Sequence, residues 1–213
     1  MEQTPVTVAA VREVGPDAVA IELETPPGFR ARPGQFVKLS AEVDGGVESR
    51  FYTISSPDVT ETFEVTVGID PEGTLAPKLA DLAAGETVDV SGPFGNAYYE
   101  DEPGVVIVAG GPGVGPAVGI AERAIADGGR AAVVYQDDEP IHEDRLAALK
   151  REGAFVEILA GDDDLAAAIE GALRETGDAQ VFVYGFADFL DAATDAVAAA
   201  GGSPDQAKVE NFG

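Results

Sequence analysis

A run of glycines after a short apolar stretch near the middle of the chain could bind a phosphate group. Residues 105–109 read Val-Val-Ile-Val-Ala, which is typical of a strand buried on both faces. Residues 110–116 read Gly-Gly-Pro-Gly-Val-Gly-Pro, and because the glycines lack a Cβ atom, backbone N–H groups in this loop can approach a phosphate. Pro116 suits the first turn of the helix expected over residues 117–124. The stretch predicts a strand, a phosphate-binding loop and a helix N-terminus, and a tight turn without a ligand is the alternative.

The half of the chain before this loop consists of short β-branched and aromatic segments separated by Gly and Pro turns. Six such segments predict a closed, six-stranded antiparallel β-barrel. One short helix is expected over residues 74–82, and a change in composition near residue 101 places the first domain at residues 1–101. The predicted strands cover residues 6–14, 18–24, 35–39, 50–55, 62–67 and 87–91.

The second half, residues 102–213, alternates apolar strands with amphipathic helices. This order predicts a doubly wound α/β domain with a five-stranded parallel sheet and right-handed crossovers. In such a sheet, ligands bind at the carboxyl ends of the strands, where the glycine loop lies. Beyond the first strand and helix, strands are expected at residues 131–135, 155–159, 181–184 and 207–210, and helices at residues 143–151, 164–175 and 187–200.

Charge and composition exclude several classes of protein. The 39 Asp and Glu against 13 Lys and Arg give a net charge of −26, which repels nucleic acid and anionic membranes. We interpret this surface as halophilic, because molar salt screens its self-repulsion, and a docking patch for a basic partner is the alternative. The absence of cysteine excludes thiol catalysis and cysteine-ligated clusters, and no metal site is predicted. The single histidine, His142, is expected on the surface.

The chain shows no targeting or membrane-spanning pattern. No apolar run approaches the roughly 20 residues that cross a bilayer, and the first residues lack the basic and apolar regions of a signal peptide. We therefore expect a cytoplasmic protein without a membrane span.

Four motifs resemble, in order, those of the ferredoxin–NADP reductase family of flavoproteins. Residues 50–53 (Arg-Phe-Tyr-Thr) are similar to its R-x-Y-[ST] flavin motif, and residues 73–79 to its second flavin segment. Residues 92–95 (Gly-Pro-Phe-Gly) resemble the G-P-x-G that closes the barrel, and residues 110–116 the pyridine-nucleotide loop. The resemblance covers essentially the whole chain and implies bound FAD, with FMN less favoured, and NAD or NADP as substrate.

The resemblance also implies roles for individual residues. Arg50 would pair with a flavin phosphate, Tyr52 would lie against the isoalloxazine ring and Thr53 would hydrogen-bond near N5. The helix from Thr74 would direct N–H groups at the phosphates. The alternative for residues 50–53 is aromatic packing in a barrel wall, with arginine at the rim. The flavin-binding residues implied are Arg50, Phe51, Tyr52, Thr53, Val67, Gly73, Thr74 and Leu75. For the nucleotide they are Gly110, Gly111, Pro112, Gly113, Val114, Pro116, Asp137, Gly185 and Phe186.

The end of the chain resembles the family's closing E-x-F segment and implies further site residues. Glu210 would lie near the flavin and nicotinamide, and Phe212 would pack beside the ring; an edge strand with a core aromatic is the alternative. The implied catalytic residues are Thr53, Tyr184 and Glu210. Three positions depart from the family pattern: Gly68 replaces a common basic residue, Ala76 replaces Ser or Thr, and Tyr184 replaces the cysteine of C-G-P.

Acidic residues follow the second strand of the nucleotide fold. Residues 136–139 read Gln-Asp-Asp-Glu, and no basic residue follows before Arg145. NAD sites place an acid about 20 residues beyond the glycine loop, on the ribose hydroxyls, whereas a 2′-phosphate would face these carboxylates. The position of Asp137 therefore favours NAD over NADP.

Three functions are consistent with these residues. The first is an NAD(P)H-dependent oxidoreductase that passes hydride to FAD and then electrons to an acceptor such as ferredoxin. The second is a flavoprotein electron-transfer subunit that works only within a larger redox complex. The third is a nucleotide-binding regulator without flavin, in which Arg50 and Tyr52 are purely structural.

Overall fold

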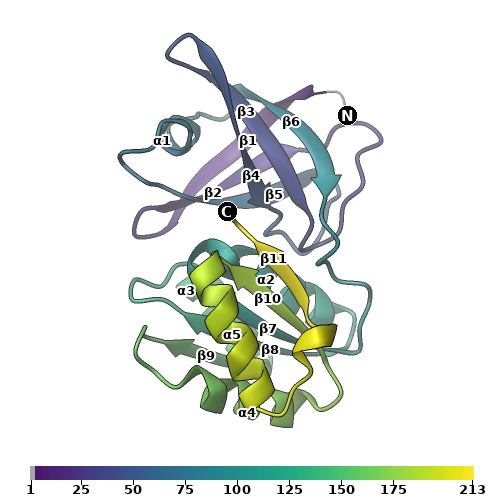
Figure 1. The fold of residues 1–213 in the computed structure, drawn as a ribbon. Helices are drawn as coiled ribbons and strands as arrows, with labels where there is room; N and C mark the ends of the chain where they lie inside the picture. The colour runs from purple at the N-terminus through teal and green to yellow at the C-terminus, as the bar shows by residue number, and fades with distance from the viewer. Residues whose placement is uncertain (1–2) are drawn as a thin grey trace.

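Alternating apolar residues in the first half fold into six antiparallel strands, in a computed structural model that describes residues 3–213 (Figure 1). The spatial order is β4-β3-β6-β1-β2-β5, and the curled sheet closes through one bridge between Ile54 and Val65. Short helix α1 (Leu75–Ala80) buries Leu75 and Leu79 in the barrel core. The strands are β1 (Thr4–Gly15), β2 (Ala18–Glu24), β3 (Phe36–Val43), β4 (Gly46–Thr53), β5 (Thr62–Gly68) and β6 (Thr87–Phe94).

The second half forms a five-stranded parallel sheet of order β11-β10-β7-β8-β9. Alternate residues of β7 face opposite sides: Ile107 packs with helices α2 and α3, and Val108 with α4 and α5. The predicted fold class is confirmed. The strands are β7 (Gly104–Gly110), β8 (Arg130–Gln136), β9 (Phe155–Leu159), β10 (Gln180–Gly185) and β11 (Lys208–Asn211). The helices are α2 (Val114–Ala126), α3 (Glu143–Arg151), α4 (Leu165–Thr176) and α5 (Ala187–Ala199), with short 3-10 turns η1 (Gly111–Gly113) and η2 (Pro204–Gln206).

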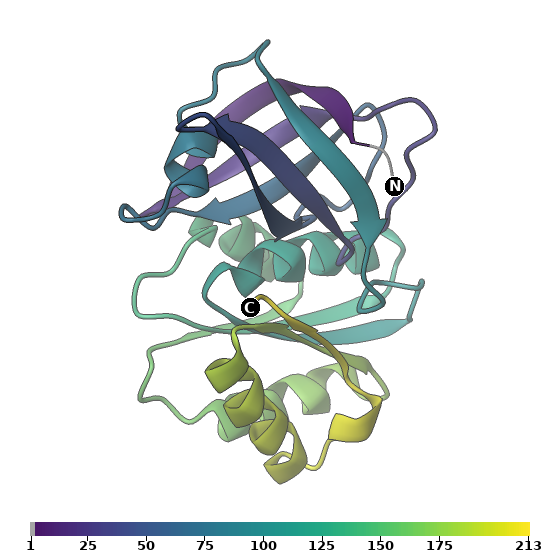
Figure 2. The ribbon, with the colours of Figure 1, turned by 45° about the horizontal axis from the view of Figure 1, so that its top comes forward.

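Helix α2 lies between the barrel and the parallel sheet, and it approaches the barrel very closely (Figure 2). A Cβ atom on Gly115 would lie 2.6 Å from Thr66 Oγ1, and one on Gly119 would lie 2.7 Å from the Ser55 carbonyl oxygen. Real Cβ contacts are not this short. Glycine at these two positions therefore lets the helix backbone rest directly on the barrel.

His142 is buried, so its expected surface position is wrong. Only 4% of the residue is exposed, and its Nε2 lies 2.8 Å from Thr66 Oγ1 in a hydrogen bond. The segment crosses to the barrel, where the His142 N–H donates to the Val14 carbonyl at 2.7 Å. Burial, then the charges of Arg145 and Arg12, lower the pKa of the imidazole to about 3. The acid-rich sequence around His142 concealed this contact because the polarity of chain neighbours does not report a tertiary partner.

None of the helices within residues 3–213 is long and apolar enough to cross a membrane.

The close approach of α2 makes a testable prediction about stability. Replacement of Gly119 by Ala should destabilise the protein by about 1–3 kcal/mol, because the methyl group would push against the Ser55 backbone. An alanine in a helix normally stabilises it, by roughly 0.5–1 kcal/mol relative to glycine. Gly171→Ala in α4 is the control, since its methyl group meets only the Phe155 ring, at 3.2 Å. Urea unfolding of both variants measures the difference, and an unchanged or higher stability for Gly119→Ala would contradict the packing.

Candidate functional site

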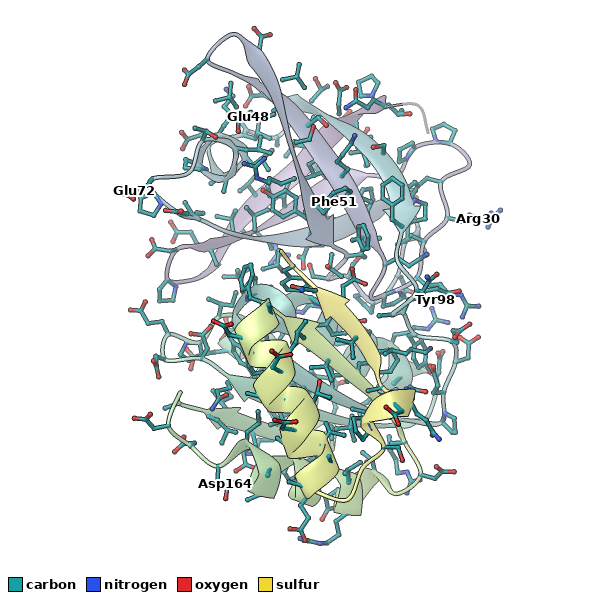
Figure 3. All side chains as sticks on the ribbon, viewed as in Figure 1. Arg30, Glu48, Phe51, Glu72, Tyr98 and Asp164 are labelled. Atoms are coloured by element: carbon teal, nitrogen blue, oxygen red, sulfur yellow. The ribbon has the colours of Figure 1, made fainter. Side chains whose placement is uncertain are left out.

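A cleft of about 430 Å³ lies between the barrel and the parallel sheet. Its walls come from β4, β5, the approach to α1, the glycine loop and the last residues of the chain. Figure 3 shows Phe51 at the end of the barrel nearest this junction. Eleven of the predicted residues line the cleft: Arg50, Phe51, Tyr52, Thr53, Gly73, Thr74, Leu75, Pro112, Pro116, Phe186 and Phe212.

Strand β4 places the residues of the first flavin-like motif along one wall. Its pairing with β3 sets Tyr52 opposite the buried Val37, and Arg50 opposite Leu39. The Arg50 guanidinium donates to the Ser49 carbonyl at 2.8 Å and has no carboxylate partner among residues 3–213. Burial raises the pKa of the Tyr52 phenol to about 12, so this ring is neutral near pH 7. The wall thus combines an uncharged aromatic ring with a cation free to bind an anion.

Strand β5 presents different residues from the one predicted. Val67 is fully buried in the barrel core and does not line the cleft, whereas Thr66 and Gly68 do. Side chains alternate along a strand, so a shift of one residue exchanges the core face for the site face. Thr66 was missed, although a polar residue between buried valines is a signal that could have indicated it.

The approach to α1 adds polar groups to the cleft and also acidic ones. Thr74 precedes the helix without capping it, and its hydroxyl donates to Glu48 Oε2 at 2.5 Å. Asp70 and Ala76, which the sequence did not single out as binding residues, line the cleft here as well. In Figure 3, Glu48 and Glu72 lie on this side of the barrel. The helix begins at Leu75 and is only six residues long, shorter than expected.

The glycines of the loop serve mainly the contacts within the protein. A Cβ atom on Gly110 would lie 2.5 Å from the Phe189 ring, and one on Gly113 would lie 2.3 Å from the Tyr184 carbonyl oxygen. Gly111 differs, because nothing lies within 4 Å of its Cβ position and its φ is +56°. Only this glycine combines an open position with a left-handed backbone, among residues 110–115. Gly110, Gly111, Gly113 and Val114 do not line the cleft, while Pro112 and Pro116 do.

Tyr184 lies beneath the site and does not face the cleft. The residue is completely buried, and its hydroxyl donates to the carbonyl oxygen of Ala97 in the segment after the barrel. Burial raises the pKa of its phenol far above the usual value. This position corrects the prediction that Tyr184 is a catalytic residue. Phe186, 51% exposed, lines the cleft instead and makes an edge-to-face contact with Phe212 at 5.9 Å between ring centroids.

Glu210 lies beside the cleft, on the edge strand β11. Its carboxylate lies 3.5 Å from the Cβ position of Gly95, and the same position is 2.9 Å from the Phe36 ring. Burial raises the pKa of the carboxyl group to about 7. Lys208 connects β11 to residues 98–102, because its Nζ donates to the Tyr98 carbonyl at 2.8 Å and to Glu102 Oε1 at 2.6 Å. The site therefore holds a group that exchanges a proton near neutral pH.

Asp137 lies at the carboxyl end of β8, away from the cleft lining. Its carboxylate accepts hydrogen bonds from the Tyr135 hydroxyl and from the Glu139 N–H, each at 3.0 Å. These two donors hold the carboxylate at the carboxyl end of β8. Gly185 ends β10 with the Phe189 ring packed against its backbone.

Comparisons with known proteins agree with this geometry. Residues 5–99 match the family model described as the oxidoreductase FAD-binding domain. The chain is 41% identical, over 92 residues, to the glycine betaine monooxygenase reductase subunit of Chromohalobacter salexigens, covering 41% of this chain and 25% of that protein. It is 30% identical over 209 residues to the 3-ketosteroid-9-alpha-monooxygenase ferredoxin reductase component of Mycobacterium tuberculosis, covering 89% and 57%. A ferredoxin NADP+ reductase structure from Neisseria gonorrhoeae, with bound FAD and NADP, aligns over both whole chains with a TM-score of 0.80 at 19% identity.

Residues 5–99 thus match an oxidoreductase FAD-binding domain, and most of the chain is similar to ferredoxin reductase components. The chain spans a quarter of the first of these two relatives and just over half of the second. The family motifs in the barrel, at residues 50–53 and 73–79, both contribute to the cleft. In the glycine-loop motif, Pro112 and Pro116 line the cleft, whereas Gly110 and Gly113 pack against Phe189 and Tyr184 of the same half.

The raised pKa of Glu210 predicts how the stability of the protein depends on pH. Between the ordinary value of 4.5 and about 7, the folded protein keeps a proton that the unfolded chain releases, so stability falls as the pH rises through this window. Glu210→Gln removes the titration. Thermal unfolding should therefore give a higher Tm for the variant than for the wild type at about pH 8, and nearly equal values at about pH 5. Glu175→Gln, an exposed carboxylate at the end of α4, is the control, and parallel pH curves for the wild type and Glu210→Gln would contradict the assignment.

Proposed function

We propose that this chain is an NAD(P)H-dependent flavin oxidoreductase that passes hydride to bound FAD and electrons onward to an acceptor such as ferredoxin. The observation that supports it most is the cleft, in which Tyr52 and Thr53 of the barrel lie across from Pro112 and Pro116 of the glycine-loop region. We assign flavin binding to residues 1–101 and nucleotide binding to residues 102–213, because each stretch contributes one sheet. This division places the reacting rings at the junction of the two halves.

The residues that are present suit a flavin. The cleft is within the size range of cofactor sites, and its aromatic members Tyr52, Phe186 and Phe212 suit a flat ring system. Arg50 suits a phosphate, because its guanidinium is exposed and no carboxylate within residues 3–213 competes for it. When bound, FAD supplies the hydride-accepting and electron-passing chemistry.

In this proposal, the protein's own groups position the flavin and the dinucleotide and supply or accept a proton. Tyr52 and Phe212 hold the ring plane, and the Thr53 hydroxyl, which makes no hydrogen bond to any group within residues 3–213, is free to donate to the flavin. Glu210 holds or releases a proton beside the site. The residues Gly111, Pro112 and Pro116 guide the dinucleotide along the start of α2.

Flavin binding and reduction by NADH test this function. The purified protein, reconstituted with FAD, should absorb in the visible range and lose that absorbance when NADH is added without oxygen. Arg50→Met should weaken FAD binding by roughly 10- to 100-fold, the value of one charge-assisted hydrogen bond to phosphate. Arg30→Met removes an exposed arginine outside the cleft and is the matched control. A protein that binds FAD but is not reduced by NADH or NADPH would overturn the proposal.

We further propose that NAD is preferred to NADP. A 2′-phosphate at the end of β8 would meet Asp137 and Asp138, both already held by hydrogen bonds. The first basic residue that follows, Arg145, is unavailable, because its guanidinium binds Glu122 of α2 and, on the barrel, Glu64 and the Ser55 carbonyl.

This preference predicts the effect of removing one charge. The wild type should have a higher kcat/KM with NADH than with NADPH. Asp137→Asn should lower the ratio of these two kcat/KM values by about tenfold, or 1.4 kcal/mol. The amide keeps the shape of the side chain and can still accept from the Glu139 N–H. Steady-state kinetics with both nucleotides measures the ratio, with the exposed Asp178→Asn as control. A ratio that favours NADPH in the wild type would exclude the preference.

A second candidate is an electron-transfer subunit of a larger redox complex. The descriptions of two relatives favour it, because one is a monooxygenase reductase subunit and the other a ferredoxin reductase component of a monooxygenase. Reduction of an artificial dye by the isolated chain with NADH separates the two, since an autonomous reductase needs no further subunit. A regulator without flavin is less consistent with Arg50, because a structural arginine would be expected to have a carboxylate partner.

A further inference from the structure

Arg145 of α3 joins three other parts of the chain at the junction of the two halves. Its Nε and Nη2 donate to the two carboxylate oxygens of Glu122 in α2, at 2.8 and 2.7 Å. Its Nη1 donates to Glu64 Oε1 in β5 at 3.0 Å, and its Nη2 also donates to the Ser55 carbonyl at 2.8 Å. The guanidinium therefore binds one helix of the nucleotide half and two points on the barrel.

The surrounding charges balance. Glu64 also binds Arg12 and accepts from the Ser55 hydroxyl at 2.8 Å, so two arginines face two glutamates. Burial alone would lower the pKa of the Arg145 guanidinium, but the bonds to Glu122 and Glu64 raise it above its usual value. A partly buried ion cluster of this kind contributes little net stability, because desolvation offsets much of its attraction. Its directional bonds nevertheless restrict the relative position of the groups that they join.

The groups that Arg145 binds lie on the same strand and the same helix as residues that line the cleft. Ser55 follows Thr53 by two residues, and its carbonyl is the one against which Gly119 packs. Glu122 lies one turn further along α2, the helix that begins at the glycine loop and carries Pro116. One side chain thus bonds to the end of the strand that presents Thr53 and to the helix that presents the nucleotide loop.

We propose that Arg145 is a positioning residue for hydride transfer, setting the flavin wall at Thr53 against the nucleotide loop before Pro116. This inference rests on the proposed function. Arg145 touches neither the cleft nor the predicted nucleotide residues, so it acts through Ser55 and Glu122. Hydride transfer is sensitive to alignment, and a misplacement of about 1 Å can cost on the order of 100-fold in rate.

Single-turnover kinetics of Arg145→Met and Arg145→Lys test the inference. On mixing FAD-loaded protein with saturating NADH, the limiting rate of flavin reduction should fall by about 10- to 100-fold in Arg145→Met and by less in Arg145→Lys. FAD content and the apparent Kd for NADH should change by no more than a few fold. Deuterated NADH should give a full primary isotope effect in the variants, because the hydride step itself is slowed. Arg174→Met is the matched control, since it breaks a guanidinium–carboxylate pair of 2.7 Å with Glu170 on the surface of α4.

The outcomes are distinguishable. Variants that keep FAD and the wild-type limiting rate would overturn the positioning role, as would a loss of rate explained entirely by lost FAD. If Arg145→Met does not fold, Glu122→Gln replaces it, because the amide removes one of the carboxylate acceptors and keeps the side-chain shape. A wild type that NADH does not reduce would refute the proposed function, and with it this inference, whereas a reduced wild type with unaffected variants refutes the inference alone.

Discussion

Direct backbone contact between α2 and the barrel is the constraint on which the rest of this structure depends. Gly115 rests on Thr66, and Gly119 on the Ser55 carbonyl, at distances that no side chain could allow. The same helix begins at the glycine loop, so its contact with the barrel also determines how far the loop lies from β4. The cleft is therefore a product of interdomain packing, because neither half could define its width alone.

Thr66 shows how packing and the site are combined in one residue. Its side chain lines the cleft, contacts the helix at Gly115 and bonds to the buried His142. The His142 imidazole is neutral at physiological pH, so this bond does not titrate there. The contacts of Thr66 at the cleft are thus uncharged. The charged groups bound by Arg145 do not line the cleft.

The sequence predicted both sheets and the wall at residues 50–53, because strand periodicity and local motifs are properties of neighbouring residues. It failed where a residue's role depends on a distant partner. Tyr184 lies away from the cleft, where its hydroxyl donates to the Ala97 carbonyl. His142 is buried, where its imidazole bonds to Thr66 of the barrel. Val67 missed the site by one position, since a motif does not reveal which face of a strand meets the core.

The scarce basic residues also have a consequence for how this acidic molecule tolerates changes in salt. Several of them link one half of the chain to the other: Arg123 binds Asp58, Arg145 binds Glu64, and Lys208 binds Glu100. Dissolved ions weaken repulsion among exposed carboxylates more than attraction within partly buried pairs. Concentrated salt should therefore reduce the repulsion among surface carboxylates and leave the partly buried Arg145–Glu64 pair largely intact. At low salt, the unscreened repulsion should act against the contacts that join the two halves.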